Sequence, residues 1–241
     1  MRPRAKWLLP GTLATVVLVV ALTALVGASV TNHLRHGDGV RAVDQPVATW
    51  VAAHRVDWLT AIMRLVTTVG CPLGVALTVV AVVGIAEWRT RRLRPALVAA
   101  VVLGGAELLQ ISIKSLVARA RPPSTLWAPG ASASGFSFPS GHATLAAAGY
   151  GLIAGLLVQY CRTTRARLAV CVAAAGATAA VGLSRVYLGV HWLSDVAVGW
   201  LIGGLWLGVV CLVAQASRAG PASVPRPELS SKFPARGTRR S

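Results

Sequence analysis

Apolar residues gather in long runs along this chain, and several runs approach the roughly 20 residues that a helix needs to cross a bilayer. The strand-like alternation of apolar and polar positions that a membrane barrel requires is absent. Only helices and closed barrels satisfy every backbone hydrogen bond in lipid, so we predict an all-α, polytopic six-helix bundle. The predicted spans are Leu8–Val30, Leu65–Ala86, Pro95–Leu116, Gly141–Tyr160, Leu168–Val186 and Trp192–Ala214.

A second pattern lies between the first two predicted spans. Apolar residues recur there at helical spacing with charged residues at their flanks, which indicates a helix lying in the membrane interface. A covering loop that packs on the bundle is an alternative, and neither version carries chemistry. The apolar positions are Val47, Trp50, Val51, Trp58 and Ile62.

Composition supports a membrane protein, since 55% of the 241 residues are hydrophobic and 13% are charged. We predict one six-span domain over residues 1–217, whose motifs occupy residues 114–195, followed by a basic, disordered tail over residues 218–241. The first span resembles a secretory signal in its basic start and small residues, but its length favours an anchor. Cleavage there would leave the topology of the other spans unchanged.

The formal net charge of +17 raises the question of nucleic acid binding. No folded basic domain with interleaved aromatic residues is visible, so we expect no nucleic acid partner. Most basic residues instead cluster at alternate span ends, and the positive-inside rule then predicts a cell-membrane protein with both termini in the cytoplasm. The clusters are Arg2, Arg4 and Lys6; Arg89, Arg91, Arg92 and Arg94; Arg162, Arg165 and Arg167; and the tail from Arg218 to Arg240.

The stretch Gly135–His142, Gly-Phe-Ser-Phe-Pro-Ser-Gly-His, falls on the predicted outer face. Pro139 and Gly141 mark a turn, and Ser140 is placed to cap the helix that follows. The free N–H groups at that helix start, beside His142, would suit an anion. In isolation the octapeptide is also explained by an ordinary capped helix.

Two cations approach the same face from the third predicted span. Glu107, Gln110 and Lys114 lie close to one helical face, so they should point into the bundle. Arg121 follows Lys114 by seven positions, about two helical turns, so both cations could project in the same direction. A snorkelling lysine and a boundary arginine would explain these two residues taken alone.

The turn between the last two spans contains a histidine and a carboxylate, His191 and Asp195, four positions apart. At helical spacing the carboxylate can accept a hydrogen bond from one ring nitrogen and leave the other nitrogen available for attack or for a metal. Taken alone, the pair is equally well explained as two groups that satisfy each other at a helix start.

The predicted topology brings these three segments to one membrane face. Three cations, two histidines, a carboxylate and a helix N-terminus suit a phosphate, whose oxygens match the guanidinium group. Each charge-assisted hydrogen bond contributes about 1.5–3 kcal/mol, so we expect the cations to dominate binding. The candidate residues are Lys114, Arg121, His142, Arg185, His191 and Asp195.

Three motifs in this order resemble the signatures of the type 2 phosphatidic acid phosphatase family, the lipid phosphate phosphatases, which form the membrane branch of the acid phosphatase and vanadium haloperoxidase superfamily. Lys114–Pro122 matches Lys-x6-Arg-Pro, Pro139–His142 matches Pro-Ser-Gly-His, and Ser184–Asp195 matches Ser-Arg-x5-His-x3-Asp. The resemblance runs from Lys114 to the sixth span, and three ordered motifs are far more specific than one. Six predicted spans argue against a soluble haloperoxidase.

The resemblance implies an enzyme that hydrolyses a lipid phosphate monoester or a polyprenyl pyrophosphate without a metal or other cofactor. It assigns His191 as nucleophile through a phosphohistidine, Asp195 as the group that orients His191, and His142 as general acid. The alternatives are a phosphotransferase that uses the same intermediate and a lipid-binding membrane protein without catalysis. The resemblance assigns the phosphate oxygens to Lys114, Arg121, Ser140, Gly141 and Arg185.

Overall fold

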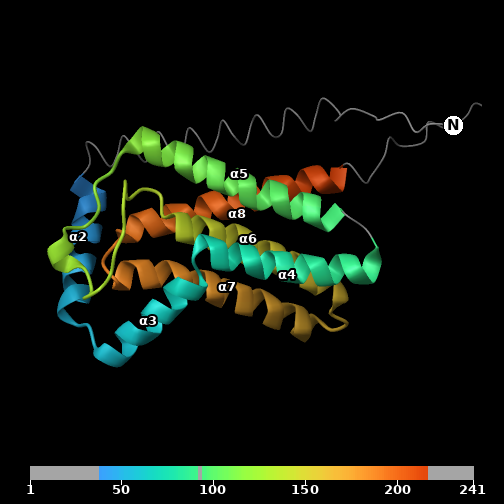
Figure 1. The fold of residues 1–241 in the computed structure, drawn as a ribbon, viewed down its shortest axis with the longest axis horizontal. Coiled ribbons are helices and arrows are strands. Elements are labelled where there is room, and N and C mark those ends of the chain that lie inside the picture. The colour runs from blue at the N-terminus through green and yellow to red at the C-terminus, as the bar shows by residue number, and fades with distance from the viewer. Residues whose placement is uncertain (1–37, 92–93, 217–241) are drawn as a thin grey trace, which may run out of the picture.

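The computed structural model describes residues 38–91 and 94–216, which form helices joined by short connections and by one longer loop, residues 118–140, between α5 and α6 (Figure 1). Helices α4 to α8 run along the long axis of the molecule, and α2 lies across one end (Figure 1). The longer helices are α2 (Asp38–Ala53), α3 (Asp57–Val69), α4 (Pro72–Thr90), α5 (Arg94–Val117), α6 (Gly141–Leu157), α7 (Thr164–Tyr187) and α8 (Leu193–Ala216). Two 3₁₀ turns, η1 (Ser124–Leu126) and η2 (Val158–Tyr160), complete the described elements.

Five helices of the described part are long and apolar enough to cross a membrane. They correspond to the last five predicted spans, whereas the first, Leu8–Val30, lies outside the described residues. The five segments are Pro72–Arg89, Arg94–Val117, Gly141–Tyr160, Thr164–Tyr187 and Leu193–Ala216.

The prediction that the second span begins at Leu65 is wrong. Helix α3 ends at Val69, and α4 starts at Pro72 after a break at Gly70 and Cys71. Proline at the first position fixes the start of α4, and the Cys71 Sγ accepts a hydrogen bond from the Gly74 N–H at 3.3 Å. The apolar run from Leu65 to Ala86 is therefore divided between two helices, which hydrophobicity alone does not reveal.

The predicted interfacial segment forms two helices, α2 and the first part of α3. Val47 packs against a cluster of buried residues from α6, α7 and α8, whereas Trp50 and Trp58 are exposed. Part of the segment therefore packs on the bundle through Val47, and it does so as helix and not as loop. The position of the segment in the membrane interface stays a prediction.

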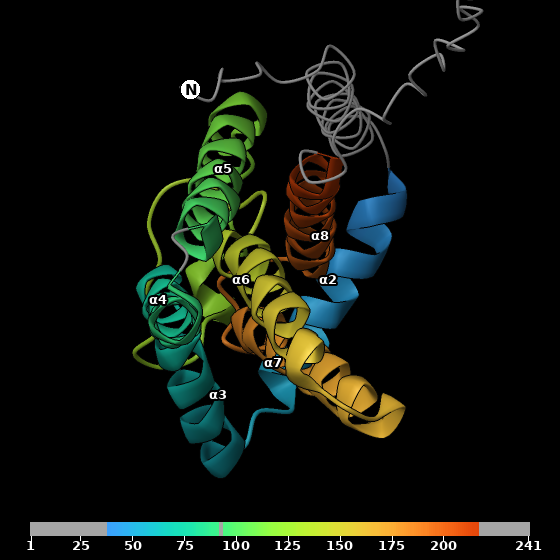
Figure 2. The same ribbon diagram turned by 90° about the vertical axis from the view of Figure 1, so that its right-hand side faces the viewer.

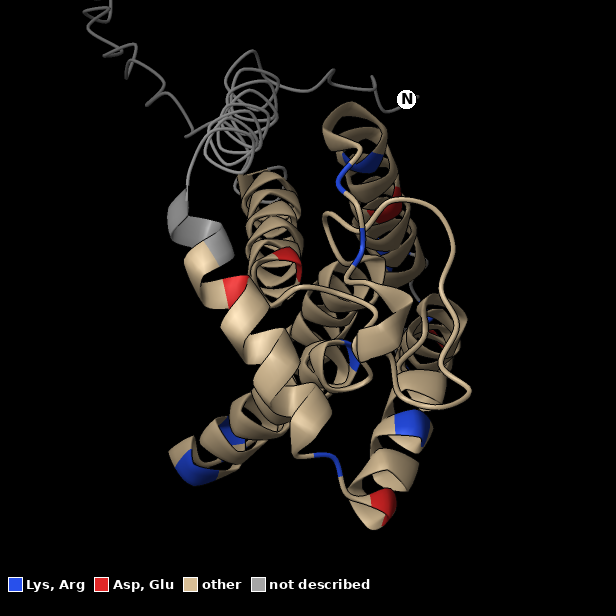
Figure 3. Ribbon diagram, turned by 90° about the vertical axis from the view of Figure 1, so that its left-hand side faces the viewer, with Lys and Arg blue, Asp and Glu red and all other residues tan. Residues whose placement is uncertain are grey.

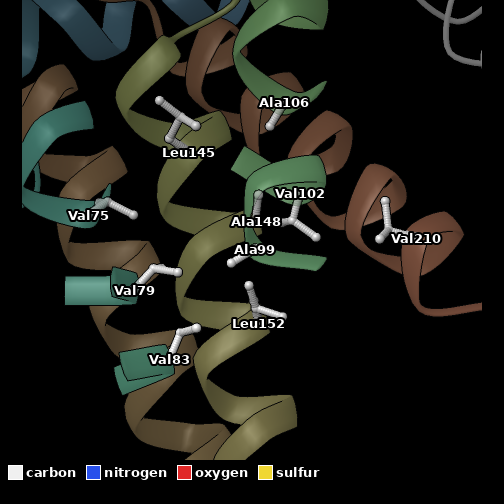
Figure 4. Packing of buried hydrophobic residues seen from close by; sticks show 10 residues of the cluster. All are labelled: Val75, Val79, Val83, Ala99, Val102, Ala106, Leu145, Ala148, Leu152 and Val210. Atoms are coloured by element: carbon white, nitrogen blue, oxygen red, sulfur yellow. The ribbon is translucent and has the colours of Figure 1, made fainter. Parts of the chain in front are cut away.

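The core of the bundle is built from small and branched apolar side chains (Figure 4). Small residues allow helices to approach closely in a membrane protein, where packing rather than water exclusion holds them together. The cluster comprises Val75, Val79, Val83, Ala99, Val102, Ala106, Leu145, Ala148, Leu152 and Val210.

Helices α6 and α8 meet at an especially short distance beside the motifs. A Cβ atom added to Gly203 would lie 2.2 Å from the Thr144 carbonyl oxygen, and one added to Gly199 would lie 2.9 Å from the Ser140 carbonyl oxygen. Only glycine fits there. The close contact brings the start of α6 against α8, and the Ser140 N–H donates to the Asp195 carbonyl oxygen at 3.0 Å.

The outer surface of the spans carries large apolar side chains that water would not favour. These side chains are exposed in the bundle and are suited to contact with lipid tails. Examples on α4, α5, α7 and α8 are Leu77, Leu97, Leu108, Leu116, Leu168, Leu201, Leu205 and Leu212.

Candidate active site

Four helix ends meet at the end of the bundle that carries residues 118–140 and 188–192, which we call the loop end (Figure 3). Helices α5 and α7 end there, with Lys114 and Arg185 in their last turns. Helices α6 and α8 begin there, with Gly141 and Asp195 in their first turns. The antiparallel order of the helices thus brings all three motif segments together.

His191 and Asp195 are neighbours, as their spacing predicts. Their Nδ1 and Oδ2 atoms lie 3.4 Å apart, and the side chains are 3% and 0% exposed. His191, however, precedes α8, which begins at Leu193. The Asp195 Oδ2 also accepts a hydrogen bond from the Trp192 N–H at 3.0 Å, so the carboxylate closes the turn in which His191 lies. The contact arises from this turn and not from a shared helical face.

The other ring nitrogen of His191 faces a cation. The NH1 group of Arg121 lies 3.0 Å from the His191 Nε2. Since a guanidinium only donates and an ionised carboxylate only accepts, these partners require the neutral tautomer with its proton on Nδ1. Nε2 then carries the lone pair, which is the form that a nucleophile needs.

Burial lowers the pKa of His191 to about 4, and the charges of Arg121 and Arg185 act in the same direction. The hydrogen bond and the negative charge of Asp195 oppose this shift and are outweighed. The imidazole is therefore neutral at pH 7. A buried, neutral histidine between a carboxylate and a cation is suited to attack an electrophile.

Arg121 reaches the site from a loop and not from a helix. Helix α5 ends at Val117, and Ala118 adopts a left-handed backbone conformation with φ of 48°. The prediction that Lys114 and Arg121 align over two turns of one helix is therefore wrong, because Arg121 lies beyond the end of α5. The two cations still converge, because the Lys114 Nζ and the Arg121 NH2 both donate to the Phe136 carbonyl oxygen at 3.1 Å.

All five N–H donors of Arg121 have acceptors within the protein. Besides Phe136 and His191, they contact the carbonyl oxygens of Ser134, Gly135 and Val190 at 2.8–3.0 Å. Arg121 thus holds the loop before α6 against the turn that carries His191. To bind a phosphate it must exchange at least one of these contacts.

Other polar groups at the loop end have donors to spare. Arg185 is 8% exposed, its NH1 donates to the Thr67 Oγ1 at 2.7 Å, and its buried Nε has no partner among the described residues. The buried Ser140 Oγ also lacks a partner there. Lys114 uses one of its three donors, on Phe136. Buried polar groups are normally paired, so these atoms are suited to an incoming ligand.

The start of α6 differs from the prediction in one respect. Ser140 occupies the N-cap position, but its side chain accepts no capping hydrogen bond. Its Oγ is left for another partner, and the N–H groups of the first turn remain unsatisfied by it. A Cβ on Gly141 would lie 3.1 Å from the Gln110 Oε1, so glycine keeps the backbone close to α5. His142 lies within electrostatic range of His191 and of the cations Lys114, Arg121 and Arg185.

This geometry is consistent with the resemblance seen in the motifs, and comparison with known proteins decides the family. The sequence profile of the PAP2 superfamily matches residues 95–219, more than half of the 241-residue chain. The chain belongs to the PAP2 superfamily.

Relatives of this PAP2 protein include two bacterial enzymes. Phosphatidylglycerophosphatase B of Bacillus subtilis strain 168 is 32% identical over 169 residues, which are 70% of this chain and 81% of that protein. Phosphatidylglycerophosphatase B of Escherichia coli K12 is 38% identical over 94 residues, which are 39% of this chain and 35% of that protein.

The fold of the PAP2 protein is similar to a solved structure. The crystal structure of a transmembrane PAP2-type phosphatidylglycerolphosphate phosphatase from Bacillus subtilis has a TM-score of 0.71 at 28% identity, covering 83% of this chain and 96% of that chain. The PAP2 protein is thus an all-α, multi-pass membrane protein and a PAP2-type lipid phosphatase. The family expected from the three motifs is confirmed.

Two side chains of the PAP2 protein that contact Asp195 were not among the predicted site residues. The Arg119 NH1 donates to the Asp195 Oδ1 at 2.6 Å, and the Ser137 Oγ donates a short hydrogen bond to the Asp195 Oδ2. Ser137 also lies 3.4 Å from the His191 Nδ1. Both residues fall at unspecified positions within or beside the motifs, so spacing gave no signal. The one signal in the sequence was that each residue lies two positions from a motif residue, Arg119 from Arg121 and Ser137 from Pro139.

The described residues of the PAP2 protein offer no obvious metal site. Over residues 38–91 and 94–216, no group of three or more His, Cys, Asp or Glu side chains could hold a metal ion. The groups around His191 are mostly cationic donors, which suit phosphate oxygens more than a metal. Metal independence remains a prediction for assay.

Proposed function

We propose that this PAP2 phosphatase hydrolyses the phosphate monoester of phosphatidylglycerophosphate through a phosphohistidine at His191. The observation that carries the proposal is the His191 ring, held between the Asp195 carboxylate and the Arg121 guanidinium beside two unpartnered donors. The names of the bacterial relatives support the choice of substrate. A polyprenyl pyrophosphate is the competing substrate class.

Phosphate binding is assigned to the groups that have donors free or exchangeable. Lys114, Arg185, Ser140 and the Gly141 N–H would each give hydrogen bonds to nonbridging oxygens. Charge-assisted bonds contribute about 1.5–3 kcal/mol each. Arg121 joins them when one N–H turns from the His191 Nε2 to a phosphate oxygen, which also frees the Nε2 lone pair. Substrate arrival and activation of the nucleophile are thereby coupled.

In the first step, the His191 Nε2 attacks phosphorus and the bond from phosphorus to the glycerol oxygen breaks. His142, in its protonated form, donates a proton to the departing oxygen, so the product leaves as an alcohol. The Nδ1 proton stays on the hydrogen bond to Asp195, which stabilises the positive charge that develops on the ring. The three cations stabilise the charge on the phosphoryl oxygens in the transition state.

In the second step, water attacks phosphorus on the opposite side from Nε2. His142 accepts a proton from this water, the bond from Nε2 to phosphorus breaks, and inorganic phosphate leaves. His191 regains its neutral form and His142 its proton, so the enzyme is ready for another cycle. An acceptor alcohol in place of water would give the phosphotransferase reaction.

The proposed orientation places the loop end outside the cell and both chain termini in the cytoplasm. The distribution of basic residues supports it, because arginines gather at the connections on the opposite end of the bundle, which faces the viewer in Figure 2. Cytoplasmic loops are enriched in such residues. The described arginines at that end are Arg89, Arg91, Arg94, Arg162, Arg165 and Arg167.

The test is a phosphate-release panel on detergent-solubilised protein in the presence of a chelator. Phosphatidylglycerophosphate, phosphatidate and a polyprenyl pyrophosphate are compared, with product analysis in the presence of added glycerol. We expect the highest kcat/KM for phosphatidylglycerophosphate, no loss with chelator, and no new phosphoester. Folded protein that releases phosphate only from the pyrophosphate would contradict the proposed substrate, and a new phosphoester would indicate a transferase.

The two histidines are separated by trapping the intermediate. His191→Ala should abolish turnover and leave no acid-labile phosphoenzyme after rapid quenching. His142→Ala should slow departure of a poor leaving group much more than that of a good one, such as a nitrophenol. Equal and mild effects of both substitutions would refute the assigned roles.

A further inference from the structure

A buried carboxylate on α2 contacts the group that holds Asp195. Asp44 is 2% exposed, and its Oδ2 accepts a hydrogen bond from the Arg119 NH2 at 2.7 Å. Its two carboxylate oxygens also accept from the Ser194 N–H at 2.9 Å and from the Ser194 Oγ at 2.5 Å. The contacts join α2 to the loop after α5 and to the first turn of α8.

Arg119 is the centre of this network. Its NH1 donates to both the Asp195 Oδ1 at 2.6 Å and the Ser194 Oγ at 2.7 Å, while its NH2 is used by Asp44. The guanidinium also lies 5.4 Å from the centre of the Trp192 ring. Because the guanidinium group is planar and rigid, fixing NH2 also fixes the direction of NH1. The Asp44 carboxylate therefore determines how Arg119 meets Asp195.

The position of Asp44 in the chain is unexpected for such a role. The residues that match the superfamily profile begin at residue 95, so α2 precedes the matched segment. The same helix has Trp50 exposed on its surface and Val47 packed on the bundle. A buried charge is costly unless it is paired and hydrogen-bonded, and among the described residues the Asp44 carboxylate is paired with Arg119 and hydrogen-bonded to Ser194.

We propose that Asp44 is a positioning residue for the reaction, acting through Arg119 to hold the Asp195 carboxylate against the His191 Nδ1. The proposal rests on the function assigned above to His191 and Asp195. Helix α2 is then part of the catalytic unit, although it lies outside the segment that matches the superfamily.

The network lies on the Nδ1 side of His191, away from the proposed phosphate donors. Arg119 and Asp44 make no hydrogen bond with Lys114, Arg121 or Arg185. Loss of Asp44 should therefore lower kcat and leave KM nearly unchanged. If Asp44 had only a structural role, its loss would lower the amount of folded protein, and the folded fraction would keep a normal kcat.

The test uses the full-length protein in detergent with the best substrate of the panel. Asp44→Asn keeps the shape of the side chain, but its amide replaces an acceptor by a donor that faces Arg119 or Ser194. Asp57→Asn is the matched control, because it removes the same charge from an exposed position in the first turn of α3. We expect Asp44→Asn to lower kcat about 10- to 100-fold, the range seen when a hydrogen-bonded partner of a metal ligand is removed, and Asp57→Asn to have no effect.

A double-substitution cycle decides whether Asp44 acts through Arg119. In an Arg119→Ala background, Asp44→Asn should lower kcat less than twofold further. Independent, multiplying losses would overturn the proposal, as would a normal kcat in folded Asp44→Asn. If Asp44→Asn does not fold, Arg119→Lys replaces it, because one ammonium cannot bond both carboxylates in the guanidinium geometry, and a normal kcat there would overturn the proposal.

Failure of the two proposals can be told apart. Inactive but folded wild-type protein overturns the proposed function and this inference together. An active wild type with unaffected Asp44 and Arg119 variants overturns this inference alone.

Discussion

The Asp195→Asn substitution tests the core of the proposed chemistry. Asp195 accepts hydrogen bonds from Arg119, Ser137 and the Trp192 N–H, and it contacts the His191 Nδ1. An amide placed there must turn its NH2 group toward one set of donors. If that NH2 faces His191, Nδ1 becomes the acceptor and the ring proton moves to Nε2. The nitrogen that should attack phosphorus then has no lone pair to offer.

The size of the effect follows from the contacts. The lost charge-assisted hydrogen bond to the developing imidazolium is worth about 1.5–3 kcal/mol, and restoring the reactive tautomer costs about 1 kcal/mol more. Together these costs are about 2.5–4 kcal/mol, which corresponds to about 10²- to 10³-fold in kcat at 1.36 kcal/mol per factor of ten. The equivalent change in a Ser-His-Asp triad costs about 10⁴-fold, so a larger loss is consistent.

The assay compares single-turnover phosphoenzyme formation with binding of a phosphate analogue. Asp195→Asn should slow formation of the phosphoenzyme by this factor, whereas affinity for inorganic phosphate should change much less, since the assigned phosphate donors are elsewhere. Thermal unfolding in detergent controls for loss of fold. A folded Asp195→Asn variant with a kcat within tenfold of wild type would refute the tautomer argument.

Four further outcomes are expected. Because burial lowers the pKa of His191 to about 4, the acidic limb of the kcat profile due to this group should lie near pH 4. A wild-type rate of phosphoenzyme formation that already falls as the pH drops through 6.5 would contradict the assignment. In the unfolded chain His191 binds its proton at a pKa of about 6.5, higher than in the folded protein. The free energy of unfolding should therefore fall as the pH drops below about 6.5, which thermal melting at several pH values measures. Ser137→Ala removes one hydrogen-bond donor to Asp195 and should lower kcat about tenfold. A kcat equal to that of the wild type would contradict this role of Ser137. Arg185→Lys loses the planar fork and should raise KM about tenfold; an unchanged KM would exclude Arg185 from phosphate binding.

Hydrophobicity predicted the last five spans well because lipid requires apolar side chains along the whole length of a spanning helix. Each span needs a long apolar run, and such a run is visible without a partner. The same measure misplaced the start of α4, since Leu65 and Ala86 belong to one apolar run that a local break divides. The break depends on Pro72 and on the side chain of Cys71, and not on average hydrophobicity.

The motifs supplied the residues proposed to act on the phosphate, but not the reason why these residues converge. Lys114 and Arg121 were expected on one helical face, yet Ala118 ends the helix and the loop brings Arg121 back to the Phe136 carbonyl oxygen. Ser140 was expected to cap α6, yet its hydroxyl is left unpartnered. Both differences arise where backbone direction changes, which periodicity does not describe.

The sequence by itself determined the membrane class, the approximate spans and the set of ionisable groups in the three motifs, because each depends on local composition or fixed spacing. Only the tertiary structure decided which groups surround Asp195. Arg119 and Ser137 come from the loop between α5 and α6, and Asp44 comes from α2. Their hydrogen bonds depend on how that loop, α2 and the start of α8 pack together. Contacts between distant segments leave no periodic signal in a single chain, so the support around His191 became visible only when the bundle was assembled.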